Sequence, residues 1–292
     1  MQRSSLKIAI TTDTHLGYKE KDEIIGNDSF LAFEECLEIA HREAADFMLH
    51  GGDLFHQAEP SMETWSRTYG ILNKQVFGAR QHNFTVENYQ QPNTSDDNHR
   101  VKMPIFMIHG NHDEPVGLKN ISALEQLHTN KNINYFGRQN SIEKLDIKPI
   151  VFSKGNIQVA VYGLGNMRRD ATLNNLLKDQ KVKWNRPTDR LGNLIEYFNI
   201  LVIHQNRYKG AIGVNRKDSV TDETIPNWFN LVLWGHEHES IPRLVPCAET
   251  GVEILQPGST VRTSLINTEQ GPKHCFTLTF EQSADDSIDY SL

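Results

Sequence analysis

The fold is indicated first by Pro104-Ile105-Phe106-Met107-Ile108-His109-Gly110-Asn111-His112-Asp113, in which a short apolar run ends abruptly in glycine and polar side chains. The same pattern occurs four more times in the 292 residues, where apolar runs end in Thr12-Asp13-Thr14-His15, His50-Gly51-Gly52-Asp53, His204-Gln205-Asn206 and Gly235-His236-Glu237-His238. Short apolar runs bounded in this way are typical of strands buried on both faces. The sequence therefore predicts at least five buried strands, each with polar side chains at its carboxyl end.

Helical patterns lie between these strands. The first covers residues 30–44, where apolar residues recur three or four positions apart and Asp28 or Ser29 supplies the N-cap. Further helices are predicted over residues 61–76, 117–128 and, more weakly, 173–180. The later runs at 251–256 and 274–280 indicate strands with no helix between them. We therefore expect an α/β protein with a second, more antiparallel sheet, in which layered sheets are covered by helices.

Composition and charge limit the class of protein. Hydrophobic residues make up 38% and charged residues 23% of the chain, an ordinary globular composition that excludes collagen-like, disordered and coiled-coil proteins. The net charge is −7, whereas proteins that bind nucleic acid are usually basic. Residues 281–292 contribute −4 of this charge, so residues 1–280 carry only −3. The acidity thus lies partly at the end of the chain and does not by itself exclude a polyanionic partner.

The cysteines and the apolar runs indicate the compartment. Cys36, Cys247 and Cys275 are an odd number at wide spacing, which excludes a disulfide framework and a Cys-x-x-Cys metal pair and favours a reducing compartment. The first apolar run is interrupted by Lys7, and no run approaches 18 apolar residues. We therefore expect a soluble intracellular protein without a membrane span.

The five polar clusters predict a metal centre. Strand ends at one edge of an α/β sheet are where functional sites assemble. Imidazole nitrogens and carboxylate oxygens without a thiolate suit manganese, iron(II) or zinc. The clusters supply more candidate ligands than one tetrahedral ion needs, and Asp53 could bridge two ions roughly 3.5–4 Å apart, as in two-metal hydrolases. Two divalent ions against Asp13 and Asp53 leave the site positively charged, which favours an anionic substrate such as a phosphate ester.

These residues resemble a known family. The order and spacing of the clusters resemble the calcineurin-like metallophosphoesterases and, within them, the eukaryotic meiotic recombination eleven nucleases, the counterparts of bacterial SbcD. The stretches that carry the closer resemblance include Thr12-Asp13-Thr14-His15-Leu16-Gly17-Tyr18, His50-Gly51-Gly52-Asp53-Leu54-Phe55-His56, Val202-Ile203-His204-Gln205-Asn206-Arg207 and Gln256-Pro257-Gly258-Ser259. The resemblance implies a four-layer α-β-β-α sandwich. It also implies a nuclease core over residues 1–280 and an acidic tail, 281–292, where a capping domain would begin.

The resemblance implies a role for each site residue. One ion would be held by Asp13, His15, Asp53 and His238, and the second by Asp53, Asn111, His204 and His236. His112 would stabilise the transition state or protonate the leaving oxygen, and His56 would be a second active-site histidine. Asp113 would orient His112, although a role in capping the turn is an equal alternative.

The implied function is that of a manganese-dependent nuclease. It would combine 3′→5′ exonuclease and endonuclease activities in the repair of double-strand breaks, in homologous recombination and in meiosis, and it would act in the nucleus. The implied partners are DNA, a second copy of the chain, an SMC-like ATPase of the Rad-fifty type and an Nbs-type regulatory subunit, which together form the MRN complex. No membrane partner is implied.

Two other functions remain open. One is a phosphatase or small phosphodiesterase of the same superfamily, although Asp53-Leu54-Phe55-His56 departs from the Gly-Asp-x-x-Asp-Arg-Gly motif of its protein phosphatases. The other is a catalytically silent dimeric repair scaffold, although such proteins usually lose metal ligands that are all present in this chain.

Several smaller features receive an interpretation and an alternative. Residues 78–103 match a eukaryote-type insertion that would bridge the homodimer and bind the Nbs-type subunit through Asn83-Phe84 and residues 89–93; the alternative is a flexible surface loop. The helices at 61–76 and 117–128 would form the dimer contact, or would simply pack on the core.

Four basic residues would contact DNA phosphates, or would be solvated, namely Arg207, Lys209, Arg216 and Lys217. Tyr18 and Lys19 would line the substrate groove.

Overall fold

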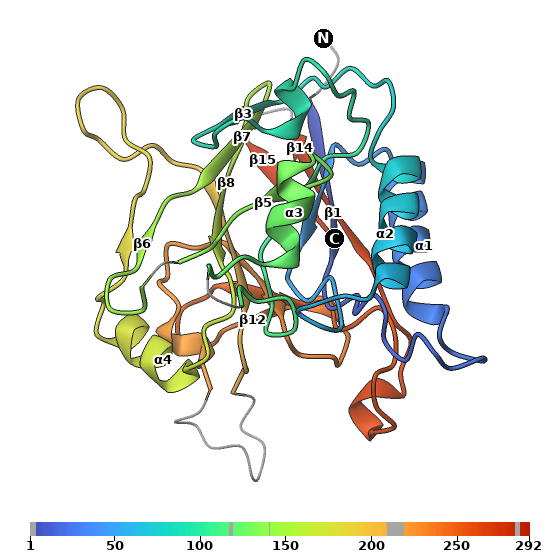
Figure 1. The fold of residues 1–292 in the computed structure, drawn as a ribbon. Coiled ribbons are helices and arrows are strands. Elements are labelled where there is room, and N and C mark those ends of the chain that lie inside the picture. Colours follow the sequence, from blue (N-terminus) through green and yellow to red (C-terminus); the bar gives the residue numbers. More distant parts are fainter. Residues whose placement is uncertain (1–3, 117–118, 140, 209–218, 284–286) are drawn as a thin grey trace.

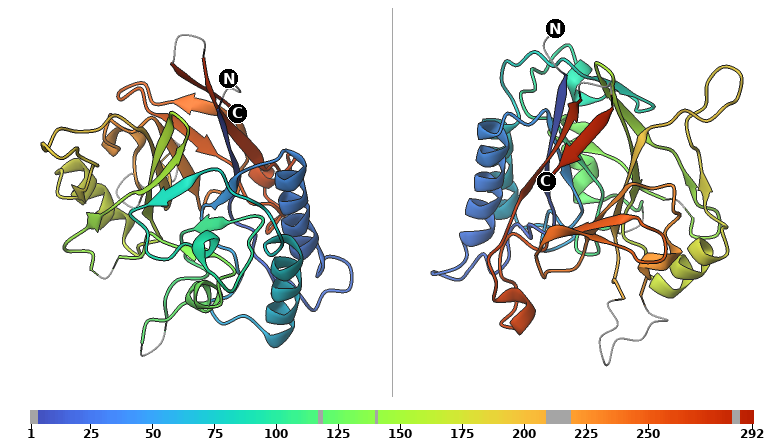
Figure 2. Two further views of the ribbon diagram at one scale, coloured as in Figure 1. Left: turned by 90° about the horizontal axis from the view of Figure 1, so that it is seen from above. Right: turned by 180° about the vertical axis from the view of Figure 1, so that it is seen from behind.

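Two mixed β-sheets pack face to face in the computed structural model, which describes residues 4–116, 119–139, 141–208, 219–283 and 287–292 (Figures 1 and 2). The first sheet has the order β15-β14-β1-β2-β4-β5 and comprises β1 (Ser5–Thr11), β2 (Phe47–His50), β4 (Ile105–Met107), β5 (Asn134–Tyr135), β14 (Phe276–Gln282) and β15 (Ile288–Ser291). The second has the order β12-β13-β11-β10-β8-β7-β3 and comprises β3 (Thr85–Glu87), β7 (Ile150–Lys154), β8 (Ile157–Leu164), β10 (Phe198–His204), β11 (Leu231–Gly235), β12 (Ile241–Pro246) and β13 (Glu253–Gln256).

Each sheet has a parallel centre, and this positions the polar clusters. Strands β1, β2, β4 and β5 run parallel in the first sheet, and β8, β10, β11 and β13 run parallel in the second. The carboxyl ends of β1, β2, β4, β10 and β11 therefore open towards one region, and the five strands predicted from the sequence are confirmed.

The two sheets differ less than expected, although the second has the larger share of antiparallel pairings. The two late strands join different sheets, because β13 pairs with β11 in parallel whereas β14 pairs with β1 in antiparallel fashion. Both sheets are consequently mixed. The edge strands β15, β12 and β3 are antiparallel to their neighbours, as is β7 next to the edge.

Alternate residues of the inner strands enter different cores, as expected for strands buried on both faces. Ile8 and Ile10 point into the core between the sheets, whereas Ala9 faces the helices that cover the first sheet. Phe106 and Met107 divide in the same way. A third core lies on the outer face of the second sheet and contains the buried Trp234.

The four-layer arrangement is confirmed, with unequal outer layers. The first sheet is covered by α1 (Asp28–Arg42), α2 (Met62–Gln75) and α3 (Ala123–Thr129). The second sheet is covered by α4 (Asp170–Lys178), by the short ribbon of β6 (Asp146–Ile147) and β9 (Lys183–Trp184) and by irregular chain (Figure 2). Aromatic packing of Tyr162, Trp184, Trp228 and Phe229 fills this fourth layer in place of a second helix.

The helix ends refine the sequence predictions. The N-cap of α1 is Asn27 rather than Asp28 or Ser29, because Asp28 already lies in the first turn. Helix α2 begins as predicted, with the Ser61 side chain accepting a hydrogen bond from the Thr64 backbone. Helix α3 is shorter than predicted and begins after a capping box formed by Ser122 and Glu125.

The segment 78–103 is integrated into the fold rather than free. Phe84 is buried in the core between the sheets, and Tyr89 donates a hydrogen bond from its hydroxyl to the Tyr135 carbonyl. Asn93 is buried and is hydrogen-bonded to Asn134. The side chains of Phe84, Tyr89 and Asn93 thus pack within this chain rather than towards a partner. Asn83, Gln90 and Gln91 are exposed, so a partner contact through this segment stays a prediction.

The prediction of an acidic tail at 281–292 is also wrong for the described residues. Strand β14 continues to Gln282, and β15 pairs with it at the edge of the first sheet. The Tyr290 ring packs against Phe198 and Phe280, and its hydroxyl bonds to Glu253.

Among the described helices, none combines the length and the apolar character needed to cross a bilayer.

Candidate metal centre

The loops that follow five inner strands bring the predicted ligands together. Asp13 and His15 follow β1, Asp53 follows β2, Asn111 follows β4, His204 ends β10, and His236 and His238 follow β11. Among the described residues, three groups have ligand atoms within 4.8 Å of one another, namely Asp13 with His15 and His238, Asp53 with His204 and His236, and His15 with His56 and His112. The first two groups are parts of the two ligand sets that the resemblance implies, and their assignment to two ions stays a prediction.

The backbone around the cluster is held in unusual conformations. Asp13, His15, Asp53 and His236 all have positive φ angles, of 51°, 46°, 54° and 80°. Such angles are uncommon for residues other than glycine and gather where the surrounding structure imposes them, often at functional sites. Gly52 is required for a related reason, because at its φ of 102° a Cβ atom would lie 2.5 Å from His204 Nδ1.

The first group surrounds one oxygen of Asp13. His238 Nε2 and His15 Nε2 lie 3.7 and 3.9 Å from Asp13 Oδ1 and 3.0 Å from each other. His15 Nε2 is also 3.8 Å from Asp53 Oδ2. Burial lowers the pKa of His15 well below its usual value, so the ring is neutral and can offer a lone pair.

The second group surrounds one oxygen of Asp53. His204 Nε2 lies 3.3 Å from Asp53 Oδ2 and 3.2 Å from Asn111 Oδ1. His236 Nδ1 is 2.8 Å from the same Asn111 oxygen. Burial lowers the pKa of His204, but the nearby Asp53 and Asp13 more than offset this and raise it to about 10. The two carboxylates thus favour a positive charge at this point.

The carboxylates of Asp13 and Asp53 suit divalent cations. Among the described residues, each has one oxygen that accepts hydrogen bonds from the protein and one oxygen without a partner. Asp13 Oδ2 accepts hydrogen bonds from Thr12 Oγ1 and the His236 backbone, and Asp53 Oδ1 accepts one from the His112 backbone. Within the described part of the chain, Asp13 Oδ1 and Asp53 Oδ2 are buried and have no hydrogen-bond partner. A buried carboxylate oxygen without a donor is costly unless a cation binds it.

His56 and His112 form a stacked pair beside the first group. Their ring centroids lie 5.0 Å apart, and the His112 ring lies 4.8 Å from that of His15. His112 Nδ1 donates to the His56 carbonyl over 2.7 Å, which leaves Nε2 free to exchange a proton. The Tyr18 ring meets His56 edge-on with ring centroids 4.9 Å apart, so Tyr18 borders the centre.

Asp113 does not orient His112. Its carboxylate is buried and accepts hydrogen bonds from the backbone of Gly110 at 2.6 Å and of Leu54 at 2.6 Å. Burial raises the pKa of Asp113 to about 7, and the neighbouring Asp53 adds to this effect. Of the two roles considered for this residue, the structure therefore supports the capping of the turns that present Asp53 and Asn111.

Replacing Asp113 by alanine is expected to destabilise the fold by about 1–3 kcal/mol for each buried donor left without a partner. The loss should appear as a lower midpoint in urea unfolding of the metal-free protein. Asp179→Ala removes an exposed carboxylate and serves as the control. Unchanged stability of Asp113→Ala would contradict the capping role.

Several hydrogen-bond partners of the candidate ligands could not be predicted from the sequence motifs. The Gly51 carbonyl accepts from His204 Nδ1 at 2.8 Å, Asn206 Oδ1 lies 2.9 Å from His236 Nε2, and Thr263 Oγ1 lies 2.7 Å from His238 Nδ1. Such outer partners fix the orientation of ligand rings. They lie in loops brought together only by the fold, so spacing along the chain does not reveal them.

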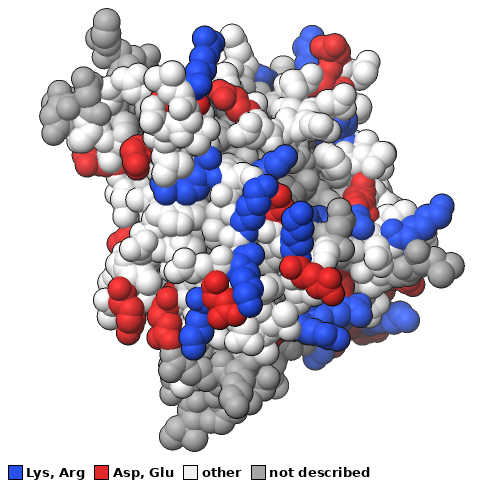
Figure 3. Space-filling model, turned by 90° about the vertical axis from the view of Figure 1, so that its left-hand side faces the viewer, with Lys and Arg blue, Asp and Glu red and all other residues white. Residues whose placement is uncertain are grey.

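The structure describes one of the four basic residues that are predicted to contact DNA phosphates. Arg207 is only 8% exposed and pairs with Asp222 at 2.7 Å, so it does not reach a DNA phosphate. Lys209, Arg216 and Lys217 lie outside the described residues. The face that carries α4 and β6 shows a band of Lys and Arg between acidic side chains (Figure 3). Ion pairs such as Lys183 with Asp146 partly neutralise the charge of this part of the protein.

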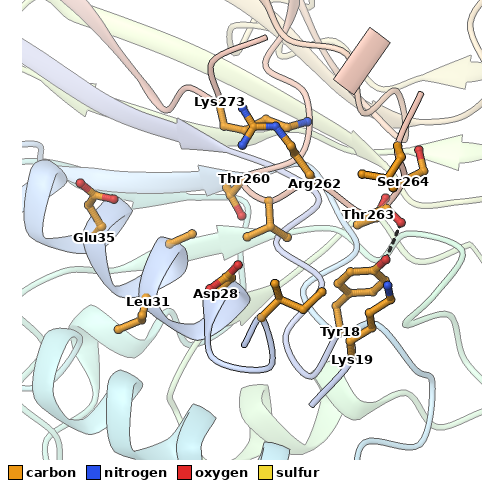
Figure 4. Close-up of a pocket in the computed structure, with 14 residues that line it drawn as sticks. Tyr18, Lys19, Asp28, Leu31, Glu35, Thr260, Arg262, Thr263, Ser264 and Lys273 are labelled. Atoms are coloured by element: carbon orange, nitrogen blue, oxygen red, sulfur yellow. Dashed lines mark hydrogen bonds between the residues drawn. The ribbon is translucent and has the colours of Figure 1, made fainter. Parts of the chain in front are cut away.

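An open pocket of about 800 Å³ lies beside Tyr18, between α1 and the loop 260–265 (Figure 4). Lys19 lines it with Tyr18, and the prediction that these two residues line a substrate groove stays a prediction. The Tyr18 hydroxyl donates to the Thr263 carbonyl and joins the two walls. Leu31 and Leu265, which are 61% and 99% exposed, also line it.

The two-sheet fold and the cluster of histidines, carboxylates and an amide at its strand ends define a metal-binding phosphoesterase. Residues 6–240 match the sequence model of the calcineurin-like phosphoesterases, and the chain belongs to that family. Membership implies divalent metal ions, which agrees with the two groups of candidate ligands.

Comparison with curated proteins shows closer relatives. The chain is 40% identical over 289 residues to the double-strand break repair protein MRE11 of Arabidopsis thaliana, covering 94% of this chain and 39% of that protein. The protein of the same name from Homo sapiens is 37% identical over 281 residues, covering 93% and 39%. The chain thus spans about two fifths of the length of these relatives. Among solved structures, a dimetal phosphatase from Danio rerio covers 95% of both chains with 12% identity and a TM-score of 0.49.

Proposed function

We propose that the chain is the nuclease core of a double-strand break repair protein and hydrolyses DNA phosphodiesters with two divalent ions, most readily manganese. The observation that carries this proposal is the pair of orphaned buried oxygens, Asp13 Oδ1 and Asp53 Oδ2, each surrounded by histidine nitrogens. The names of the relatives support the choice of DNA as the substrate. We assign Asp13, His15, Asp53 and His238 to one ion, and Asp53, Asn111, His204 and His236 to the other.

Two divalent ions bound there would supply Lewis acidity towards the phosphoryl group and would lower the pKa of a water molecule towards 7. The protein's own contribution is positioning and proton transfer. A water molecule first loses a proton to solvent. As the resulting hydroxide oxygen bonds to phosphorus, the bond to the sugar oxygen breaks, and the imidazolium form of His112 donates its Nε2 proton to that oxygen and regains one from solvent. The His56 carbonyl holds His112 in the orientation that this transfer needs, and the His56 ring supports it by stacking.

The proposed biological setting follows from the same relatives. We propose action in the nucleus, in homologous recombination and meiosis, as a homodimer with an SMC-like Rad-fifty-type ATPase and an Nbs-type subunit of an MRN complex. The dimer contact would lie on α2 and α3. This assignment is supported by Met62, which is 82% exposed on α2, and by the half-buried, stacked rings of Trp65 and Tyr69 on the same helix.

A comparison of substrates tests the proposed activity. The metal-free chain is loaded with manganese, and turnover of end-labelled duplex and hairpin DNA is compared with turnover of a phosphopeptide and of a small phosphodiester. We expect DNA cleavage to exceed the other reactions by at least tenfold. Preferred turnover of the phosphopeptide or the small ester would assign a different phosphoesterase. Fewer than one bound manganese per chain, without cleavage of any substrate, would indicate a silent scaffold.

A further inference from the structure

The loop after β13 contacts the ring of one candidate ligand. Thr263 Oγ1 lies 2.7 Å from His238 Nδ1, on the side of the ring opposite to Nε2. Behind this hydroxyl lies the buried carboxylate of Glu269, whose oxygens are 3.3 and 3.5 Å from Thr263 Oγ1. Thr263 stands on the loop that faces Tyr18 in Figure 4. Contacts therefore run from Glu269 through Thr263 to His238, and Glu269 Oε1 also lies 3.5 Å from His238 Nδ1 directly.

The direction of the hydrogen bonds follows from the donors around Glu269. One carboxylate oxygen accepts from the Thr263 backbone N–H at 2.8 Å, and the other accepts from Ser264 Oγ at 2.6 Å. Both oxygens of Glu269 thus accept hydrogen bonds, as those of an ionised carboxylate do. Such a carboxylate favours a Thr263 hydroxyl that donates to Glu269 and accepts from His238 Nδ1–H, and its own 3.5 Å distance to Nδ1 favours the same proton on that nitrogen.

This arrangement selects one tautomer of His238. With the proton on Nδ1, the lone pair is on Nε2, which lies 3.7 Å from Asp13 Oδ1 and 3.0 Å from His15 Nε2. A metal ion requires the lone pair, and the hydrogen bond at the other ring nitrogen decides where that lone pair is.

The backbone of the same histidine is held by a second residue of the loop. Lys273 Nζ donates to the His238 carbonyl at 2.9 Å and to Ser259 Oγ at 2.8 Å, and it lies 3.7 Å from Glu269. Arg262 donates to the Glu269 carbonyl at 3.1 Å and closes the loop on itself. Both the ring and the main chain of His238 thus depend on a segment beyond residue 240, where the family match ends.

We propose that Glu269 is a positioning residue of the metal centre, which acts through the Thr263 hydroxyl to hold His238 in the tautomer that presents Nε2 to a divalent cation. The inference rests on the ligand role proposed for His238, but it does not depend on the identity of the substrate.

The first test uses two changes of the Thr263 side chain in the full chain. Thr263→Val keeps the shape and removes the hydroxyl, and it is expected to weaken one of the two manganese-binding events about 10- to 100-fold in calorimetric titration of the metal-free protein. Thr263→Ser restores a hydroxyl and should recover affinity to within about threefold of wild type, by the same reasoning. Thr260→Val is the matched control, because Thr260 Oγ1 has no partner within the described chain. It should bind manganese as wild type does.

The second test reads the tautomer directly. Nitrogen-15 spectra of the metal-free protein should show His238 protonated on Nδ1 in wild type and in Thr263→Ser. Mixed protonation is expected in Thr263→Val and in Glu269→Gln, whose amide can itself donate to the hydroxyl. A role limited to loop packing would lower the melting temperature without moving these signals.

Wild-type manganese affinity and Nδ1 protonation in both Thr263→Val and Glu269→Gln would overturn the inference. If one of the two variants does not fold, the other decides. DNA cleavage is measured separately. A wild-type chain that binds two manganese ions but cuts no DNA would contradict the proposed nuclease, while the affinities and spectra would still decide the role of Glu269.

Discussion

Replacing His112 by asparagine is expected to lower DNA cleavage by about 100- to 10,000-fold while both manganese ions stay bound. The ring is the group placed to protonate the leaving oxygen, since its Nδ1 is engaged by the His56 carbonyl and its Nε2 is free. The contact that His112 makes with the ligand Asp53 comes from its backbone N–H, which the substitution keeps. Proton transfer and metal binding are therefore separable at this residue.

The measurement is single-turnover cleavage of labelled DNA at saturating manganese, together with the metal content of the same sample. His99→Asn is the matched control, because the His99 side chain is exposed. Among the described residues, its ring contacts only the Asp96 carboxylate and the Phe77 ring. Cleavage by His112→Asn at a rate within threefold of wild type would refute the proton-transfer role.

The Asp53→Asn variant is expected to lose at least 100-fold in manganese affinity and to show no measurable cleavage. Asp53 Oδ2 is within 3.3 Å of His204 Nε2 and 3.8 Å of His15 Nε2, so it is the oxygen shared by the two ligand groups. An amide is nearly the same size and keeps the acceptor for the His112 backbone, but it lacks the charge and the second ligating oxygen. Both ions are therefore affected by one substitution.

Calorimetric titration with manganese checks this expectation, with unfolding curves recorded in parallel. Asp46→Asn provides a matched control at another buried carboxylate, which bonds to Lys154 and the Lys7 backbone rather than to the centre. Two tight manganese-binding events in Asp53→Asn would exclude a bridging role for Asp53.

The parts of the site that can be predicted from the sequence are those in which a polar residue directly follows a buried strand. The candidate ligands could be predicted because each follows a buried apolar run, and parallel strands present their carboxyl ends at the same edge. Asp113 was ambiguous from sequence, since a carboxylate beside His112 can orient a ring or cap a turn. The structure resolves this through two backbone donors, Gly110 and Leu54, one of which is 59 residues away along the chain.

Residues whose contacts come from segments far away in the sequence could not be predicted. Phe84, Tyr89 and Asn93 occupy a polar, turn-rich segment that has the composition of an exposed loop. They are held by side chains and carbonyls of β5, β7 and the core between the sheets. Arg207 was read as a phosphate contact for the same reason, because its partner Asp222 lies beyond another polar connection.

The strands, the candidate ligands and the kind of ion that they suit can be inferred from the amino-acid sequence alone. Those properties depend on local hydrophobic patterns and on the chemistry of single side chains, which are present in any conformation of the chain. The oxygens left for a cation, the hydrogen bonds that set each histidine tautomer and the charges that remain unpaired are visible only in the folded protein. Those properties depend on burial and on contacts between loops of both sheets, and neither exists until the chain has folded.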